Sequence, residues 1–162
     1  MDYPKAPRVK RRSLWFLAIT LLTLSGAAWL WLRPYEWHPD PAAPAEIETA
    51  SLRRDESYFW LDLRLDTRDL RAVPEPLFVE TPSGAEIKPA QIDYQGPGPI
   101  SGTEDGTLPQ IDAIFLKFWL EESSLQGPLA LRIGNGRLRV RTRSGIPSVK
   151  NGNTRIYHSS RW

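Results

Sequence analysis

The sequence predicts a mainly β protein: an antiparallel β-sandwich of immunoglobulin-like size and architecture, preceded by one transmembrane α-helix. Three observations lead to this prediction. An uncharged apolar run occupies residues 14–32 of the 162-residue chain. Several later segments alternate apolar and polar residues with a period of two, as half-buried strands do. Turn signals such as Asn135-Gly136 separate these segments. A small barrel is the alternative architecture.

The apolar run over residues 14–32 is long enough for a membrane helix and contains no charge and no proline. At about 1.5 Å per residue it spans roughly 28 Å, close to the thickness of a bilayer's hydrocarbon core. We expect an uncleaved signal anchor. Signal-peptide cleavage near Ser25-Gly26-Ala27 is the competing interpretation, but the run continues past these small residues to residue 32.

The residues that flank the run predict its orientation. Five cations precede it within thirteen residues, and the positive-inside rule places such a tail in the cytoplasm. The predicted location is the inner (cytoplasmic) membrane, single-pass, with the C-terminal portion periplasmic or extracellular. Aromatic residues near both ends are expected to anchor the helix at the membrane interfaces: Trp15, Trp29, Trp31, Tyr35 and Trp37.

Composition divides the chain into four predicted parts. They are a basic cytoplasmic tail (1–13), the transmembrane helix (14–32), a Pro-rich extended stalk (33–49) and an exported β-sandwich domain (50–162). Net charge changes sign along the chain, from +5 over residues 1–33 to −11 over 34–122 and +8 over 123–162. Because the portion after the tail is not basic overall, we expect no nucleic-acid partner.

Seven segments of the exported part have strand patterns, and the predicted strands cover 57–66, 77–80, 85–88, 90–94, 111–121, the hairpin 128–143 and 154–158. In the first, Phe59, Leu61, Leu63 and Leu65 share one face. The predicted hairpin turns at Asn135-Gly136 in a type I′ geometry. That register places Ile133 opposite Leu138 and Arg132 opposite Arg139.

The residue inventory gives little support for catalysis. The chain has no Cys and only two His, His38 and His158, neither of which is near a nucleophile motif. No phosphate loop, dinucleotide fingerprint or metal-ligand spacing occurs. We therefore expect no enzyme activity, no cofactor and no metal site. An exported hydrolase is the least supported functional class.

A row of arginines is the first candidate interaction feature, formed by Arg137, Arg139, Arg141 and Arg143 on one strand with Arg132 across the hairpin. Facing arginines repel each other and need anions nearby. Acidic side chains of other strands could supply them, which would make the row internal. The competing interpretation is an outward cationic face for anionic lipid, polymer or an acidic protein.

Aromatic residues on faces expected to be polar are the second feature: Tyr58, Trp60, Phe115 and Trp119. Either a loop or the C-terminal tail covers them, or they form a platform for a partner. The tail itself carries Tyr157 and Trp162, and it either adds a strand to a partner's sheet or is a loose terminus.

Together these features predict a non-catalytic accessory, assembly or protein-interaction module on a membrane anchor. Its expected partners are the lipid bilayer and another envelope protein or a cell-surface polymer. The alternative is a module that binds carbohydrate or anionic lipid through the surface aromatics and the arginine row.

Overall fold

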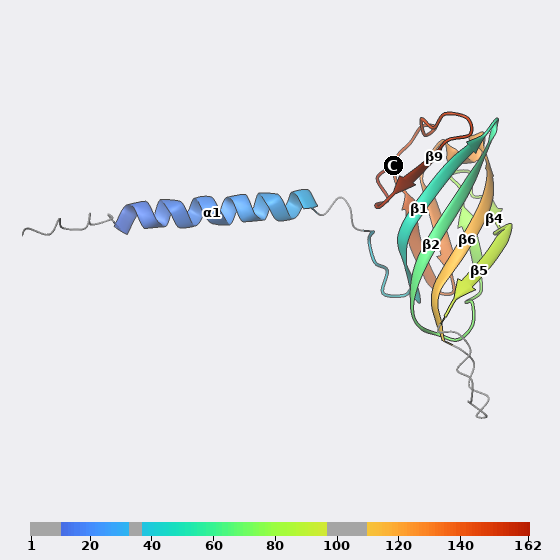
Figure 1. Ribbon diagram of the computed structural model, residues 1–162, viewed down its shortest axis with the longest axis horizontal. Helices are drawn as coiled ribbons and strands as arrows, with labels where there is room; N and C mark the ends of the chain where they lie inside the picture. Colours follow the sequence, from blue (N-terminus) through green and yellow to red (C-terminus); the bar gives the residue numbers. More distant parts are fainter. Residues whose placement is uncertain (1–10, 33–36, 97–109) are drawn as a thin grey trace, which may run out of the picture. The chain divides into compact units, whose positions relative to one another are not determined.

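The computed structural model describes residues 11–32, 37–96 and 110–162, without the side chains of 11–14, 30–32, 68 and 69. The chain divides into two compact units, Met1–Tyr35 and Glu36–Trp162. The first contains α1 (Arg11–Leu32), and the second contains all the strands (Figure 1).

Helix α1 begins three residues before the predicted helix and ends with it. The Thr20 and Thr23 hydroxyls donate to the carbonyls of Phe16 and Ile19, at 2.8 and 3.0 Å, so these polar groups are satisfied within the helix. Over the described residues, however, no helix combines the length and the apolar character that a membrane crossing requires. The predicted transmembrane span is therefore not supported.

The second unit is mainly β and consists of two antiparallel sheets (Figure 1). The five-stranded sheet contains, in spatial order, β5 (Gln91–Gln95), β6 (Ile111–Glu121), β2 (Tyr58–Leu70), β1 (Ala45–Asp55) and β9 (Thr154–Tyr157). The four-stranded sheet contains β4 (Glu86–Ile87), β3 (Leu77–Glu80), β7 (Leu129–Ile133) and β8 (Gly136–Arg141). A short 3₁₀ helix, η2 (Glu122–Leu125), follows β6.

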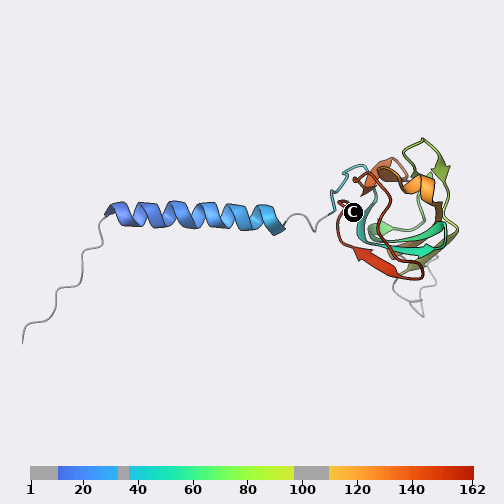
Figure 2. The same ribbon diagram turned by 90° about the horizontal axis from the view of Figure 1, so that it is seen from above.

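One hydrophobic core lies between the sheets. Leu61 of β2 and Leu116 of β6 enter it from one sheet, and Leu131 of β7 and Val140 of β8 enter it from the other. Figure 2 views the strands nearly end-on and shows the two sheets on opposite sides of this interior. Because the described strands pair into two sheets and not into one closed sheet, the alternative of a small barrel was wrong.

The period-two patterns predicted the inward-facing residues correctly. Phe59, Leu61, Leu63 and Leu65 are all buried, and β6 has the bounds expected from its alternation. Between β3 and β4 the chain turns at 81–84, where the Gly84 amide donates to the Thr81 carbonyl at 3.0 Å. Apolar alternation succeeds here because each strand of a two-layer structure has one face on the core and one in solvent.

The hairpin exists, but its predicted register was wrong. Ile133 pairs with Gly136, Arg132 with Arg137 and Leu131 with Leu138, so the two-residue loop is Gly134-Asn135. Gly134 has φ +54° while Asn135 keeps a negative φ, the sign pattern of a type II′ turn. Shifting the pairing by two residues leaves the side chains from Arg137 to Val140 on their predicted faces.

Close packing explains why residue 136 of β8 is glycine. A Cβ atom added to Gly136 would lie 2.3 Å from the Ala43 Cα. The segment before β1 therefore crosses the hairpin at a distance that only glycine permits. No short-range sequence signal reports such a crossing.

The predicted stalk is shorter than expected, because β1 begins at Ala45 and Ala45 is itself buried. Trp37 packs against the core, and its indole nitrogen donates to the Glu48 carbonyl at 3.0 Å. Residues 37–49, expected to hold the domain away from the lipid, are thus partly built into it. Their prolines favour an extended backbone, and this also suits the approach to an edge strand.

Candidate functional site

The arginine row does not form a uniform outward cationic face, one of the two interpretations that the sequence left open; acidic side chains of the fold pair with part of it. Arg141 is buried, with only 2% of its surface exposed. Its guanidinium donates to the carbonyl oxygens of Trp162 at 2.8 Å and of Gly127 at 3.3 Å, and also to those of Leu125 and Gly145. It also lies 5.3 Å from the centre of the Trp162 ring. Burial lowers the pKa of Arg141. Its hydrogen bonds connect three segments of the chain, which are residues 125–127, Gly145 and Trp162.

A β-bulge turns Arg141 inward. Ala130 pairs with Arg139 but Leu129 pairs with Arg141, so Val140 is the extra residue on β8. Val140 and Arg141 are consequently buried in succession, and the alternation that exposes Arg137 and Arg139 is interrupted. The prediction that Arg141 faces outward was wrong for this reason.

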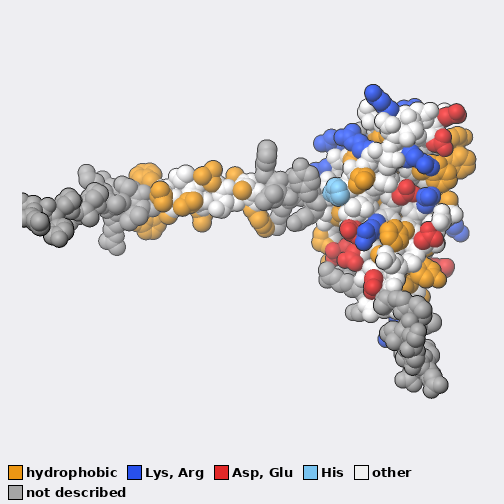
Figure 3. Space-filling model, viewed as in Figure 1, with side chains coloured by type: hydrophobic (Ala, Val, Ile, Leu, Met, Phe, Trp, Pro, Cys, Tyr) orange, Lys and Arg blue, Asp and Glu red, His pale blue; other side chains and the backbone are white. Residues whose placement is uncertain are grey.

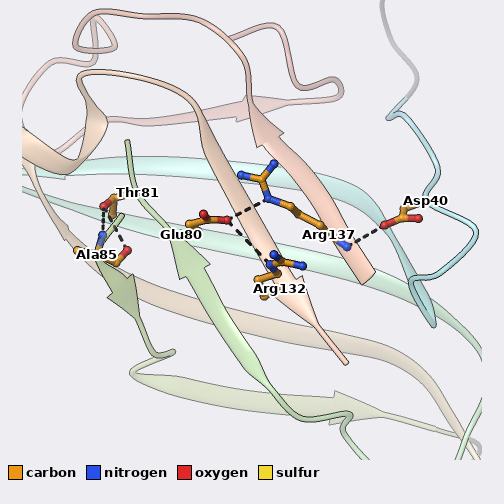
Figure 4. A network of polar contacts seen from close by, with 6 residues as sticks. All are labelled: Asp40, Glu80, Thr81, Ala85, Arg132 and Arg137. Carbon is orange, nitrogen blue, oxygen red and sulfur yellow. Dashed lines mark hydrogen bonds and ion pairs between the residues drawn. The ribbon is translucent and has the colours of Figure 1, made fainter. Parts of the chain in front are cut away.

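Arg132 and Arg137, which lie directly opposite each other, share one carboxylate (Figure 4). Glu80 Oε2 lies 3.0 Å from Arg137 Nε and 4.0 Å from Arg132 Nε. Glu80 therefore offsets the repulsion between two facing cations. The sequence does not reveal this partner, because the pairing of β3 with β7 is non-local.

Asp40 supports the same hairpin from outside. Its carboxylate accepts the backbone amide of Arg137 at 2.8 Å (Figure 4). It also accepts the backbone amide of Ala42 at 3.0 Å. These two hydrogen bonds lower the pKa of Asp40, the one from Arg137 more than the other.

Arg139 and Arg143 are exposed, and within the described residues neither has a hydrogen-bond or ion-pair partner. Arg137 and Arg139 also line a groove of about 440 Å³ on the outer face of the four-stranded sheet, together with Glu80, Thr81 and Thr142. We call this the arginine groove. It is what remains of the predicted cationic row.

Three aromatic rings come together on the outer face of the five-stranded sheet. Tyr58 and Trp119 lie 4.7 Å apart between ring centroids, and Trp60 stacks on Trp119 at 6.1 Å. Tyr58 is 39% and Trp119 is 53% exposed, so the C-terminal tail does not cover them. Figure 3 shows hydrophobic side chains gathered at the upper right of this face. We call Tyr58, Trp60 and Trp119 the aromatic cluster.

A second groove, of about 460 Å³, runs across β1, β2, β6 and β5 on the same face. It is lined by Thr49, Ser51, Asp62, Leu63, Arg64, Asp93, Phe115, Leu116 and Lys117. Phe115 lies beneath the Arg64 guanidinium, 5.5 Å from ring centroid to Cζ. Lys117 Nζ lies 6.0 Å from the centre of the Trp60 ring, so this groove adjoins the aromatic cluster.

Tyr157 and Trp162 are used within the chain. Their rings stack at 4.5 Å, and Trp162 is buried. Burial raises the pKa of Tyr157, while Arg155 and Arg141 lower it by smaller amounts. β9 adds to the edge of its own sheet beside β1, and the prediction of a loose or partner-seeking tail was wrong, because the stacked rings and Arg141 hold it in place.

The predicted membrane-interface residues divide into three groups. Trp15 and Trp29 are exposed on α1. The side chains of Trp31 and Tyr35 lie outside the described residues. Trp37 packs on the β unit and is half-buried. In the described part of the chain, no three His, Asp or Glu side chains gather as a metal site requires.

No protein-family model, no curated protein and no solved structure matches this chain.

Proposed function

We propose that this chain is a non-catalytic, membrane-anchored module that docks another envelope protein through the outer face of its five-stranded sheet. The observation that carries the proposal is the aromatic cluster: Tyr58 and Trp119 touch each other yet remain 39% and 53% exposed. Large aromatic side chains exposed together are uncommon on monomers and mark interaction surfaces.

The surroundings of the cluster support a protein partner. Interfaces place aromatic anchors at the centre and polar groups at the rim. Here Lys117 lies 4.0 Å from Asp62, and Arg64 lies 2.7 Å from Glu48, on strands beside the rings. These exposed ion pairs contribute little to stability, so their charges remain able to orient a partner.

A carbohydrate ligand at the same face is the second candidate, and the groove beside Trp60 favours it. Its lining combines the Phe115 ring with hydroxyl and carboxylate groups such as Ser51 and Asp62. Sugars need this pairing of apolar surface and hydrogen-bonding groups.

The membrane location is a part of the proposal that rests on the sequence. Its support is the uncharged run 14–32 and the basic residues before it, together with the exposed apolar side chains along the described part of α1. The immunoglobulin-like comparison rests likewise on domain size and two-layer architecture. Carbonate extraction of cell membranes tests the anchor: the full chain should stay in the pellet, and its release would contradict an anchor. N-terminal sequencing of the same material reports cleavage.

Site-specific photo-crosslinking tests the docking face. We expect benzoylphenylalanine at position 119 or 58 to give discrete protein adducts in intact cells. The same group at position 139, on the opposite sheet, is the matched control and should give none of these adducts. Adducts that collapse on glycosidase treatment would favour the carbohydrate candidate.

A paired variant then connects the adducts to the cluster. Tyr58→Ala with Trp119→Ala should abolish co-purification of the crosslinked protein while leaving the circular dichroism spectrum unchanged. Equal adduct yields from positions 119 and 139, or retained co-purification, would overturn the proposed docking face.

A further inference from the structure

The arginine groove, on the sheet opposite the aromatic cluster, has unused hydrogen-bond donors. Arg132 and Arg137 both approach Glu80 through Nε. Within the described residues, their Nη nitrogens and the whole guanidinium of Arg139 have no acceptor. All three side chains are at least partly exposed, so an incoming ligand can reach these donors.

Charge in and beside the groove is not balanced. Four arginines lie in or beside the groove, Arg132, Arg137, Arg139 and Arg141, against two carboxylates, Glu80 and Asp40. This leaves an excess of two positive charges. Glu86 pairs with Glu80 across β4 and β3, but two strand spacings, about 10 Å, separate it from the strand of Arg132. Arg141 contributes its charge but no donors, because backbone carbonyls take them.

The strand geometry places the three guanidinium stems close together. Arg137 and Arg139 are two residues apart on one strand, about 7 Å along the sheet. Arg132 is directly opposite Arg137, with Cβ atoms of such pairs about 5 Å apart. The flexible side chains can therefore converge on one small group from three directions.

We propose that the arginine groove is a binding site for a phosphate monoester group. Such a group carries about −1.5 to −2 charge at pH 7 and presents three acceptor oxygens. The charge matches the excess of two positive charges, and the three oxygens match the guanidinium groups of Arg132, Arg137 and Arg139. A carboxylate has one charge and two oxygens, so it would leave one arginine unpaired. Guanidinium groups bind phosphate through paired N–H donors. This inference does not depend on the proposed docking function.

Calorimetric titration of the full chain in a nonionic detergent with inorganic phosphate tests the site. We expect saturable binding to one site. Arg139→Ala removes charged hydrogen bonds and should raise the Kd about tenfold. Because Arg139 has no partner in the described residues, the melting temperature without phosphate should not change.

Two variants make the test specific. Arg53→Ala removes an exposed arginine of the other sheet and should leave the Kd within about twofold of wild type, since the change in net charge is the same. Glu80→Gln removes the competing carboxylate and should lower the Kd several-fold. It should also lower the melting temperature without phosphate, and phosphate should restore it. Absence of saturable phosphate binding, or an equal loss of phosphate affinity in Arg139→Ala and Arg53→Ala, would overturn the proposed site.

Two further titrants identify the source of the phosphate group. Glycerol 3-phosphate is a soluble monoester, and short-chain phosphatidic acid carries the same group on a lipid. Tighter binding of phosphatidic acid indicates a lipid headgroup, whereas equal binding indicates a soluble phosphate. Short-chain phosphatidylglycerol, a diester with one charge, should bind more weakly than either. If it binds as tightly as both monoesters, the proposed charge match is wrong.

Discussion

The outer faces of the two sheets use their large side chains differently. On the five-stranded sheet, Tyr58, Trp60 and Trp119 contact one another and remain accessible. On the four-stranded sheet, arginines that look equivalent in sequence have separate roles. Arg141 is buried in the fold, whereas Arg139, two residues before it, is exposed.

This difference shows that residue type and spacing do not by themselves indicate a surface site. Some arginine donors are already used by hydrogen bonds within the fold, as those of Arg141 are. Only the donors that such bonds leave over, on Arg132, Arg137 and Arg139, are open to a ligand. On the aromatic face, mutual ring contact leaves most of the apolar surface of Trp119 uncovered, so little of it is used by the fold.

The largest expected effect is the difference between two arginines of one strand. Arg141→Ala leaves buried carbonyls without donors and should lower the free energy of unfolding by about 3 kcal/mol or more. Arg139→Ala should change it by less than about 0.5 kcal/mol. Urea denaturation followed by tryptophan fluorescence measures both. Similar losses in the two variants would contradict the separation of roles.

The next largest expected effect on stability concerns the close packing of Gly136 in β8. Gly136→Ala forces a Cβ atom against the Ala43 backbone and should cost about 1–3 kcal/mol by overpacking. Adding Ala43→Gly should not restore stability, because the closest atom is the Ala43 Cα and not its side chain. Thermal unfolding of the single and double variants measures this. Full recovery in the double variant would mean that the backbones are farther apart than described.

Coupling within the aromatic cluster is expected to be smaller. A double-mutant cycle with Tyr58→Ala and Trp119→Ala should give an interaction energy of about 0.5–1.5 kcal/mol. Tyr94 is an exposed ring on β5, and its pair with Tyr58 is the control. We expect no interaction energy between these two residues. Denaturant unfolding supplies the energies. A coupling equal to that of the control would show that the rings do not pack on each other in solution.

The smallest effect concerns Asp40, the half-buried carboxylate that accepts the Arg137 amide of the β8 hairpin. Its pKa in the folded protein is lowered from 3.8, so its ionised form contributes stability above that pH and loses the contribution as the pH falls through the folded-state value. Stability curves of wild type and Asp40→Asn should therefore differ at neutral pH and converge below 3.8. A difference in the free energy of unfolding between the two proteins that is the same at every pH would exclude a contribution from the ionisation of Asp40.

Local patterns determined which residues form most strands and which of their faces are buried. Phe59 to Leu65 and the alternating residues of β6 enter the core as predicted, since hydrophobic burial and the two-residue repeat of a strand act within one segment. The helix over 14–32 follows from the same local logic. Its relation to a membrane does not, because the described residues of α1 do not support a crossing.

Segments distant in sequence decided the rest. Ala43 approaches Gly136 so closely that only glycine fits there. Glu80 reaches Arg132 and Arg137 only because β3 pairs with β7. The sequence by itself determined most strands and their buried faces, but not β1, which it did not predict, nor whether the aromatic residues of the five-stranded sheet are covered or exposed. Tertiary structure alone decided which arginines are hydrogen-bonded within the fold, because the acceptors of a guanidinium lie on the segments that the packed core brings within hydrogen-bond distance.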